Sequence, residues 1–414
     1  MFLLRRFHEQ RYDRINAVID GLNGHLTGYV NLVGSATLPL PEVCRAQGFP
    51  GSAVRAEGFP GARVFPASEV ADEVEAIIDE RTRVLFGLDD SYCVTGQPHS
   101  ATQANQAAFH AVIPSEDSVV LGLAPADGGH VSHRAALPRS TEFFPFPLSA
   151  DGIDYDALEA LASRRSVSLV VAGGTSYGLH IDYERLRRVA DQSGAHLHAD
   201  LAHTAPFVAS GRHPSAFPYC DSATLDTGKS LRGPRGGILI YREDCAKRMR
   251  RGLFPTVQTS PSQSVMMAKA VCLSHWDHQA LEEFSDRLVA TANRLHEGLD
   301  GVLGEPVFGG TDSHLLLYDA SRLGVRGDQA ESDLERVRIL ANRNQVPGDP
   351  NSPWSPSGLR FGTTVPAILG YSDDDMRRLG SAVRDVLAGC GDPREVVDDL
   401  LSTYHRDVVS VASE

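Results

Sequence analysis

Hydrophobic residues along this chain recur with two different periods, and the two periods alternate over most of its length. Repeats at helical spacing predict helices over residues 69–86, 100–112, 155–163, 183–193 and 247–253. Short apolar runs predict strands over residues 119–121, 169–172 and 196–199. Because strands that alternate with helices form βαβ units, the pattern favours the α/β class, with a mostly parallel sheet covered on both faces.

The pattern changes toward both ends of the chain. A polar helix over 6–22 comes first, so we expect residues 1–27 to form an arm outside the core. A helical pattern over 264–295 is long enough to link two domains. A smaller α+β unit follows, with expected strands over 314–318 and 358–361 and helices over 329–342 and 372–387. We therefore expect a large domain over 28–285 and a small C-terminal domain over 286–414.

Composition and charge exclude several classes of protein. The formal net charge of -14 leaves no basic field for nucleic acid. No apolar stretch approaches the roughly 20 residues that span a bilayer, and the apolar run at the start is too short for a signal peptide. The six cysteines are scattered without metal-binding spacing, so we expect reduced thiols and no metal. These features favour a cytoplasmic enzyme without nucleic-acid or membrane partners.

A lysine between small residues is the first candidate for chemistry. Lys229 follows Thr227-Gly228 and precedes a Gly-Pro-Arg-Gly-Gly sequence and an apolar run. A buried lysine in such surroundings can lose its proton and hold pyridoxal phosphate (PLP) as a Schiff base. Upstream, Asp200 closes a predicted strand, where a carboxylate would keep a pyridinium nitrogen protonated. The alternative for Lys229 is an exposed turn residue before a strand.

A helix start and a late strand supply further candidates. Ser100, Ala101 and Thr102 lie where a loop enters a helix, so their hydroxyl and backbone N–H groups could hold a phosphate. The alternative is a plain helix N-cap. Arg360 lies in a strand among small residues, where it could grip a carboxylate with two hydrogen bonds or form an interdomain ion pair.

Three polar side chains follow other predicted strands, at the edge where parallel sheets bind ligands. His130 comes after Gly128-Gly129, which would allow close approach to a flat ring. Thr175 could donate to an oxygen on such a ring, and His203 is the third candidate. Taken singly, the three could equally be a loop, a turn and a core residue.

The order and spacing of these residues follow one family. The matching segments are Gln97-Pro98-His99-Ser100, Gly128-Gly129-His130-Val131-Ser132-His133, Ile153-Asp154-Tyr155, Asp200-Leu201-Ala202-His203, Lys229 to Gly237, Phe254-Pro255-Thr256-Val257-Gln258, Gly310-Thr311-Asp312-Ser313-His314 and Val346-Pro347-Gly348-Asp349-Pro350. Over essentially its full length the chain resembles the serine hydroxymethyltransferase (glycine hydroxymethyltransferase) family. The resemblance implies a fold-type I PLP-dependent transferase, with the aspartate aminotransferase-like fold.

The resemblance also implies roles for the cofactor-binding residues. Lys229 would form the Schiff base, and Asp200 would pair with the pyridine nitrogen. His130 would stack on the ring, while His203 and Thr175 would lie beside its phenolic oxygen. The phosphate would be held by Ser100, Ala101 and Thr102.

Substrate binding and proton transfer are implied in the same way. Arg360 would bind the substrate carboxylate. Glu57 matches a proton-handling carboxylate that comes from the partner subunit, which implies a homodimer with shared active sites. With Lys229, His130 and Asp226, Glu57 completes the candidate catalytic set.

The chain departs from the family at several of these positions. Arg55 and Phe65 replace tyrosines, and Gly228 replaces a histidine. Asp226 replaces a threonine; it could steady a cation, bind a basic substrate group, or be neutralised by Arg55. The Gly-Gly pair that reaches the phosphate across the dimer is replaced by Thr259-Ser260.

Two further departures concern the substrate and folate. The family's Glu-Asn is Ala36-Thr37, next to Ser35, and a leucine that flanks folate is Pro125. Asn344, at a folate-contacting position, is kept. Because the expected PLP-holding residues are kept while the surrounding shell changes, we expect the same chemistry on a different substrate, with Ser35, Arg55 and Phe65 among its contacts.

Three hypotheses follow. In the first, a PLP enzyme of specialised, antibiotic-type metabolism acts at Cα and Cβ of an L-amino acid. It would eliminate a β-hydroxyl from a basic, arginine-like amino acid before addition or cyclisation, or carry out threonine-type transaldol chemistry. The alternative is folate-dependent transfer of a hydroxymethyl group between serine and glycine. A third possibility, PLP binding without turnover, is disfavoured by Lys229, Glu57 and Arg360.

Overall fold

The computed structural model describes residues 9–113 and 118–405. Its central sheet consists, in spatial order, of β4 (Tyr92–Thr95), β12 (Gly237–Arg242), β11 (Ser222–Asp226), β10 (His196–Asp200), β9 (Val167–Ala172), β5 (Val119–Gly122) and β6 (Glu142–Pro145). The five strands β11, β10, β9, β5 and β6 run parallel to one another. Strand β12 runs antiparallel to both of its neighbours, β11 and β4. The predicted α/β class and mostly parallel sheet are confirmed.

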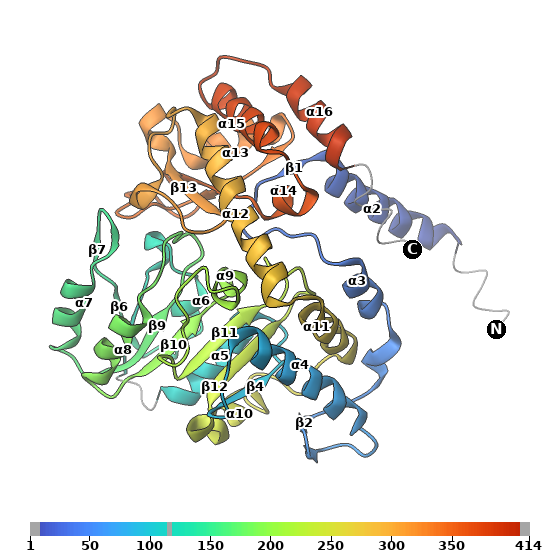
Figure 1. Cartoon of the computed structure of the whole chain (residues 1–414), viewed down its shortest axis with the longest axis vertical. Helices are drawn as coiled ribbons and strands as arrows, with labels where there is room; N and C mark the ends of the chain where they lie inside the picture. Colours follow the sequence, from blue (N-terminus) through green and yellow to red (C-terminus); the bar gives the residue numbers. More distant parts are fainter. Residues whose placement is uncertain (1–8, 114–117, 406–414) are drawn as a thin grey trace.

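Helices lie on both sides of this sheet (Figure 1). The longer ones are α4 (Val70–Phe86), α5 (Ala101–Val112), α7 (Tyr155–Ala162), α8 (Tyr183–Asp191), α10 (Ala246–Leu253) and α11 (Gln263–His275). Shorter elements are α3 (Pro41–Gln47), α6 (Ser132–Ala135), α9 (Ala205–Ala209), β2 (Gly58–Phe59), β3 (Ala62–Arg63), β7 (Leu148–Ser149) and β8 (Gly152–Ile153). The inner strands of the central sheet are largely buried, and their apolar residues form two hydrophobic clusters with the covering helices.

A second, smaller unit packs above the sheet in Figure 1. Its antiparallel sheet has the order β13 (Leu315–Asp319), β16 (Gly358–Gly362) and β15 (Asn342–Asn344). The helices around it are α13 (Gly327–Arg336), α14 (Thr364–Leu369), α15 (Asp373–Leu387) and α16 (Arg394–Tyr404). This unit has its own hydrophobic cluster, which includes Leu316, Phe361 and Leu379.

The first strand after the N-terminal helix packs against this smaller unit. Strand β1 (Val30–Asn31) pairs in parallel with β14 (Ile339–Leu340), and Val30 and Leu32 belong to the second cluster. Residues close to 28, the expected start of the large domain, therefore pack against the C-terminal unit. The boundary at 285 stays a prediction; one helix, α12 (His278–Leu299), contributes to both clusters.

The prediction of one helix over 264–295 is wrong. α11 ends at His275, and α12 begins at His278. Asp277 accepts a hydrogen bond from the backbone N–H of Ala280, which caps the new helix. Trp276 leaves the helical path to donate its indole N–H to Leu231 O at 2.9 Å. The tertiary contact of Trp276 and the cap at Asp277 together override the helical periodicity.

The helix expected over 329–342 is also shorter than predicted. α13 ends at Arg336, and Arg338 has a positive φ of 64° that reverses the chain. The next residues form β14 and β15 instead. Ile339 is fully buried, so pairing with β1 and burial of this side chain outweigh the helical pattern.

The N-terminal helix extends further along the chain than expected. α2 covers Glu9–Gly28, whereas the prediction was 6–22, and residues 6–8 lie outside the described part of the chain. Large apolar side chains of α2 are exposed, including Ile15 at 50% and Leu22 at 62%, as expected for an arm outside the core. Within the described ranges, no helix is both long and apolar enough to span a membrane.

Close packing of α12 on α15 provides a test of the smaller unit. A Cβ atom added at Gly380 would lie 2.5 Å from Leu295 O and 2.7 Å from the Cα of Gly298. Gly380→Ala should therefore lower the free energy of unfolding by about 1–3 kcal/mol, because the helices must separate. Urea denaturation measures the change. Gly24→Ala is the control, since nothing lies within 4 Å of a Cβ there; equal losses in both variants would contradict this packing.

Candidate active site

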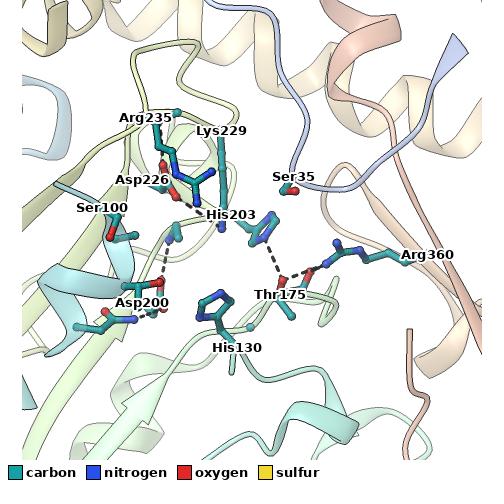
Figure 2. Close-up of a pocket in the computed structure, with 16 residues that line it drawn as sticks. Ser35, Ser100, His130, Thr175, Asp200, His203, Asp226, Lys229, Arg235 and Arg360 are labelled. Atoms are coloured by element: carbon teal, nitrogen blue, oxygen red, sulfur yellow. Dashed lines mark hydrogen bonds and ion pairs between the residues drawn. The ribbon is translucent and has the colours of Figure 1, made fainter. Parts of the chain in front are cut away.

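A cavity of about 350 Å³ lies at the carboxyl ends of the central parallel strands. Figure 2 shows polar side chains from both units pointing into it. The lining residues predicted from the sequence are Ser35, Ser100, Ala101, Thr102, His130, Thr175, Asp200, His203, Asp226, Lys229 and Arg360. The structure thus brings together residues that are spread over most of the chain.

Asp200 is the last residue of β10, and its side chain is almost fully buried. Its Oδ2 lies 2.9 Å from His133 Nε2 and accepts a hydrogen bond of 2.8 Å from Asn105, while Oδ1 accepts the N–H of Ala202 at 3.0 Å. Burial by itself would raise the pKa of Asp200. The hydrogen bonds from His133 and Asn105, with the charge of Lys229, nevertheless hold this pKa below its usual range. The carboxylate is therefore ionised and ready to pair with a cation.

Lys229 follows the end of β11 and points into the cavity (Figure 2). Its Nζ lies 3.9 Å from Oδ2 of Asp226, which itself accepts the N–H of Gly228 at 2.9 Å. Burial lowers the pKa of Lys229, although Asp226 and Asp200 oppose that shift. Burial also raises the pKa of Asp226. The amine is thus easier to deprotonate than a surface lysine, which is what a nucleophilic amine requires.

Lys229 is one of three lysines in the chain, and the other two are not available to the cavity. Lys247 is exposed on α10. Lys269 is fully buried, and its ammonium donates to the carbonyl oxygens of Gly96, Pro98 and Gly237 at 2.6, 2.8 and 2.9 Å. The alternative of an exposed turn lysine is therefore wrong for Lys229.

Two histidines lie on different sides of the cavity. His130 Nδ1 accepts the backbone N–H of Ser132 and contacts its hydroxyl at 2.7 Å, so Nε2 carries the proton. Burial lowers the pKa of His130 to about 4, and the ring is neutral near pH 7. His203 Nε2 lies 3.3 Å from Oγ1 of Thr175. Its Nδ1 is buried and has no partner among the described residues.

The N-terminus of α5 opens onto the same cavity. Ser100 caps this helix by accepting the N–H of Gln103 at 3.1 Å, so the plain N-cap function is present. The amides of Ala101 and Thr102 belong to the first turn and have no intrahelical carbonyl partner. Positive potential and free N–H groups at a helix start suit a phosphate.

Arg360 crosses from β16 of the smaller unit to the cavity. Its Nη1 donates to the carbonyl oxygen of Thr175 at 2.6 Å and to its hydroxyl at 3.0 Å, and Nε donates to Asn342. No carboxylate of the described residues forms an ion pair with Arg360, which disfavours the interdomain ion pair. The guanidinium is therefore buried, oriented and able to receive a carboxylate.

Five predicted site residues do not line the cavity of their own chain: Glu57, Arg55, Phe65, Thr259 and Ser260. Two of the segments that carry them lie side by side, since the N–H of Ala56 donates to Ser260 Oγ at 3.0 Å. Arg55 and Thr259 are exposed, and Phe65 is 41% exposed. Within one chain, no ion pair joins Arg55 to Asp226 among the described residues, so that neutralisation is not observed.

Sequence reasoning missed two polar lining residues, Asn105 and Arg235, and two small ones, Gly174 and Ala202. Arg235 lies within the Gly-Pro-Arg-Gly-Gly sequence, which was a sufficient signal. Asn105 is one turn into α5 and lacked any distinctive neighbour. The structure also explains Gly228, because a Cβ at this position would lie 2.7 Å from the Cα of Arg235. A side chain there would displace the loop that carries Arg235.

Comparison with known proteins agrees with this geometry. The family model for serine hydroxymethyltransferase matches residues 10–383. The chain belongs to the serine hydroxymethyltransferase family. It is 34% identical to the serine hydroxymethyltransferase of Cupriavidus necator over 94% of both chains. It is 35% identical to serine hydroxymethyltransferase 1 of Pseudomonas aeruginosa and to the serine hydroxymethyltransferase of Halorhodospira halophila, over 92% of each chain.

Membership of this family bears on four of the predictions. Its members are PLP-dependent enzymes of fold type I that act on amino acids and are typically dimeric, so the predicted family, fold, enzyme class and cofactor are confirmed. The cavity suits PLP, because an amine, an ionised carboxylate and a helix start with free N–H groups face it together.

The ion pair of Asp226 and Lys229 can be tested by titration. Asp226→Asn removes a charge that raises the pKa of Lys229, so this pKa should fall further. Since the neutral amine is the nucleophile, Schiff-base formation should reach half its maximal rate about one pH unit lower. Absorbance after adding PLP to apoprotein at different pH values measures the shift. Asp226→Glu keeps the charge and is the control; identical pH profiles would show that Asp226 does not influence the lysine.

Proposed function

We propose that this protein uses PLP to transform an L-amino acid at Cα and Cβ, with Lys229 as the residue that binds the cofactor. The observation that carries the proposal is the arrangement of Lys229, Asp200 and Arg360 around one cavity. Bound PLP supplies an electron sink for bonds at Cα.

The proposed contacts divide the cavity into three parts. Asp200 pairs with the pyridine nitrogen, and its low pKa keeps the carboxylate ionised for this purpose. The first turn of α5 and Ser100 hold the phosphate. His130, neutral at its ring, packs on the cofactor, while Thr175 and His203 lie beside its oxygen.

Arg360 binds the carboxylate of the substrate in this proposal. Thr175 already fixes one edge of the guanidinium, so little rotational freedom is lost when substrate binds. A fixed carboxylate sets which bond at Cα faces the electron sink. Ser35 lies on the same side of the cavity (Figure 2) and can donate to the same group.

Several predicted site residues do not line the cavity of their own chain, which suggests that a second subunit supplies them. Glu57, Arg55 and Phe65 lie outside the cavity of their own chain, as does the Thr259–Ser260 pair. In a homodimer with shared active sites these segments would reach the partner's cavity, with Glu57 handling protons and Thr259 and Ser260 near the phosphate. The typical dimers of the family support this proposal.

The names of the relatives favour one reaction, hydroxymethyl transfer between serine and glycine. This reaction is therefore the better supported candidate. It needs a proton-handling carboxylate, which Glu57 supplies, and a folate site, for which Asn344 is the retained residue. In this structure Asn344 donates to Ser176 Oγ at 3.1 Å, beside the loop that holds Thr175.

A specific observation supports the second candidate, a basic β-hydroxylated amino acid in specialised metabolism. Asp226 places a carboxylate within the cavity, 3.9 Å from Lys229. With PLP held by Lys229, Asp226 would no longer face a free ammonium group there and could bind a cationic group of the substrate. Elimination of a β-hydroxyl would follow, or transaldol chemistry with threonine. Serine has an uncharged side chain and therefore offers Asp226 no cationic group to bind.

Lys229→Ala should abolish covalent PLP binding while leaving the fold intact, because it removes the only lysine amine that faces the cavity among the described residues. Borohydride reduction followed by peptide mass spectrometry should locate the cofactor on residue 229 in the unaltered protein. Lys247→Ala is the matched control, since that side chain is exposed. Labelling at Lys247 or Lys269 in place of Lys229 would refute the assignment.

The two candidate reactions are separated by a substrate panel. Purified holoenzyme is incubated with serine plus tetrahydrofolate, with threonine, or with β-hydroxylated basic amino acids, and products are followed by mass spectrometry. If Asp226 binds a cationic group, Asp226→Asn should reduce kcat/KM for the basic substrate by about 10- to 100-fold more than for serine. Folate-dependent turnover of serine, with no reaction of the basic amino acids, would establish hydroxymethyl transfer.

A further inference from the structure

A row of polar residues crosses the core beneath the cavity. His196, His198 and Asp200 occupy alternate positions of β10, so their side chains project from the same face of this central strand. All three are almost fully buried, at 7%, 0% and 6% exposure. Two histidines on the face of a buried strand are costly unless they are hydrogen-bonded.

The row is completed by residues from two neighbouring elements. Ser222 of β11 lies opposite His198 in the strand register, and its Oγ is 2.7 Å from both His196 Nε2 and His198 Nδ1. Asn105 of α5 covers the other end. Its Oδ1 lies 3.0 Å from His198 Nε2, and its Nδ2 donates to Asp200 at 2.8 Å.

The direction of every hydrogen bond in this row follows from the charge of Asp200. The ionised carboxylate only accepts, so Asn105 must present its NH₂ to Asp200 and its oxygen to His198. His198 therefore carries its proton on Nε2, and its Nδ1 accepts from the Ser222 hydroxyl. That hydroxyl in turn accepts from His196 Nε2–H. All donors point toward Asp200.

We propose that Ser222 and His198 are positioning residues for Asp200, which act through the amide of Asn105. The hydroxyl of Ser222 selects the tautomer of His198, and this tautomer holds the Asn105 amide in the orientation that donates to the carboxylate. Hydrogen bonds aligned in one direction polarise one another, so the last donor is strengthened. The inference rests on the proposed pairing of Asp200 with the pyridine nitrogen.

The row begins at a separate cavity of about 250 Å³. His196 lines it together with Asp221, Arg187 and Arg248, and His196 Nδ1 lies 3.9 Å from Asp221 Oδ2. Solvent on that side thus lies next to the first donor, while the last donor reaches the active site. Ser222 is therefore well separated along the strand from the residues that contact the cofactor in our proposal.

Ser222→Ala removes the central hydroxyl and leaves the other members in place. In full-length protein with ¹⁵N-labelled histidine, we expect His198 to change from a single Nε2–H tautomer to a mixture. The dissociation constant for PLP should rise about 3- to 10-fold, as expected for one lost hydrogen bond. Ser222→Thr keeps the hydroxyl and should restore both properties.

Ser285→Ala is the matched control, because Ser285 is also fully buried and contacts Ser210 Oγ at 3.1 Å outside the row. A merely structural role for Ser222 predicts equal PLP affinity in the two alanine variants, and that result would overturn the proposal. An unchanged His198 tautomer would overturn it as well, and so would a tautomer change without a change in affinity.

Asp200→Asn separates this inference from the proposed function. It should weaken PLP binding more than tenfold, because the charge that pairs with the pyridinium is lost. If Asp200→Asn leaves PLP affinity unchanged, the placement of the pyridine nitrogen is wrong. If it weakens binding while Ser222→Ala does not, that placement stands and only the positioning role fails.

Discussion

One buried negative charge organises the active site of this protein. An ionised carboxylate away from water is unfavourable unless several donors surround it, and Asp200 receives donors from three different segments. Each donor belongs to a different segment: Asn105 to α5, His133 to the short helix α6, and Ala202 to the turn after β10. The carboxylate therefore helps to determine how the two helices and this turn meet.

The same charge connects the two parts of the cavity that the chemistry needs. Asp200 and Asp226 end neighbouring parallel strands, β10 and β11, and both oppose the effect of burial on Lys229. Without these carboxylates the amine would be neutral over a wider pH range. Arg360 comes from the smaller unit, so the cavity is complete only when both units are packed together.

Much of this arrangement could be predicted from the sequence because it depends on local rules. Strand ends in a parallel sheet collect ligand-binding residues, and the motifs around Lys229 and Asp200 are distinctive. The helix break at Trp276 and the short α13 could not be predicted from periodicity, since long-range contacts with Leu231 and β1 decide them. Asn105 was missed for a related reason, because its partners His198 and Asp200 lie far away in the sequence, on β10.

The tension between the two candidate reactions has a structural basis. The cavity brings together the PLP-holding residues that the resemblance to the family implies. Asp226 and Gly228 depart from the family's pattern, and so do four residues outside the cavity: Arg55, Phe65, Thr259 and Ser260. A Cβ atom at Gly228 would lie 2.7 Å from the Cα of Arg235, so a side chain at this position would require the loop of Arg235 to move.

The scarcity of lysine has a practical consequence for chemical work on this protein. The ammonium of Lys269 is buried and donates to three carbonyl oxygens, and Lys229 lies inside the active site. Lys247 on α10 is therefore the single exposed lysine side chain of the described residues. Of the lysine side chains, amine-directed dyes, crosslinkers and solid supports should then react mainly with this one. Attachment through Lys247 would hold the molecule in one orientation without engineered residues.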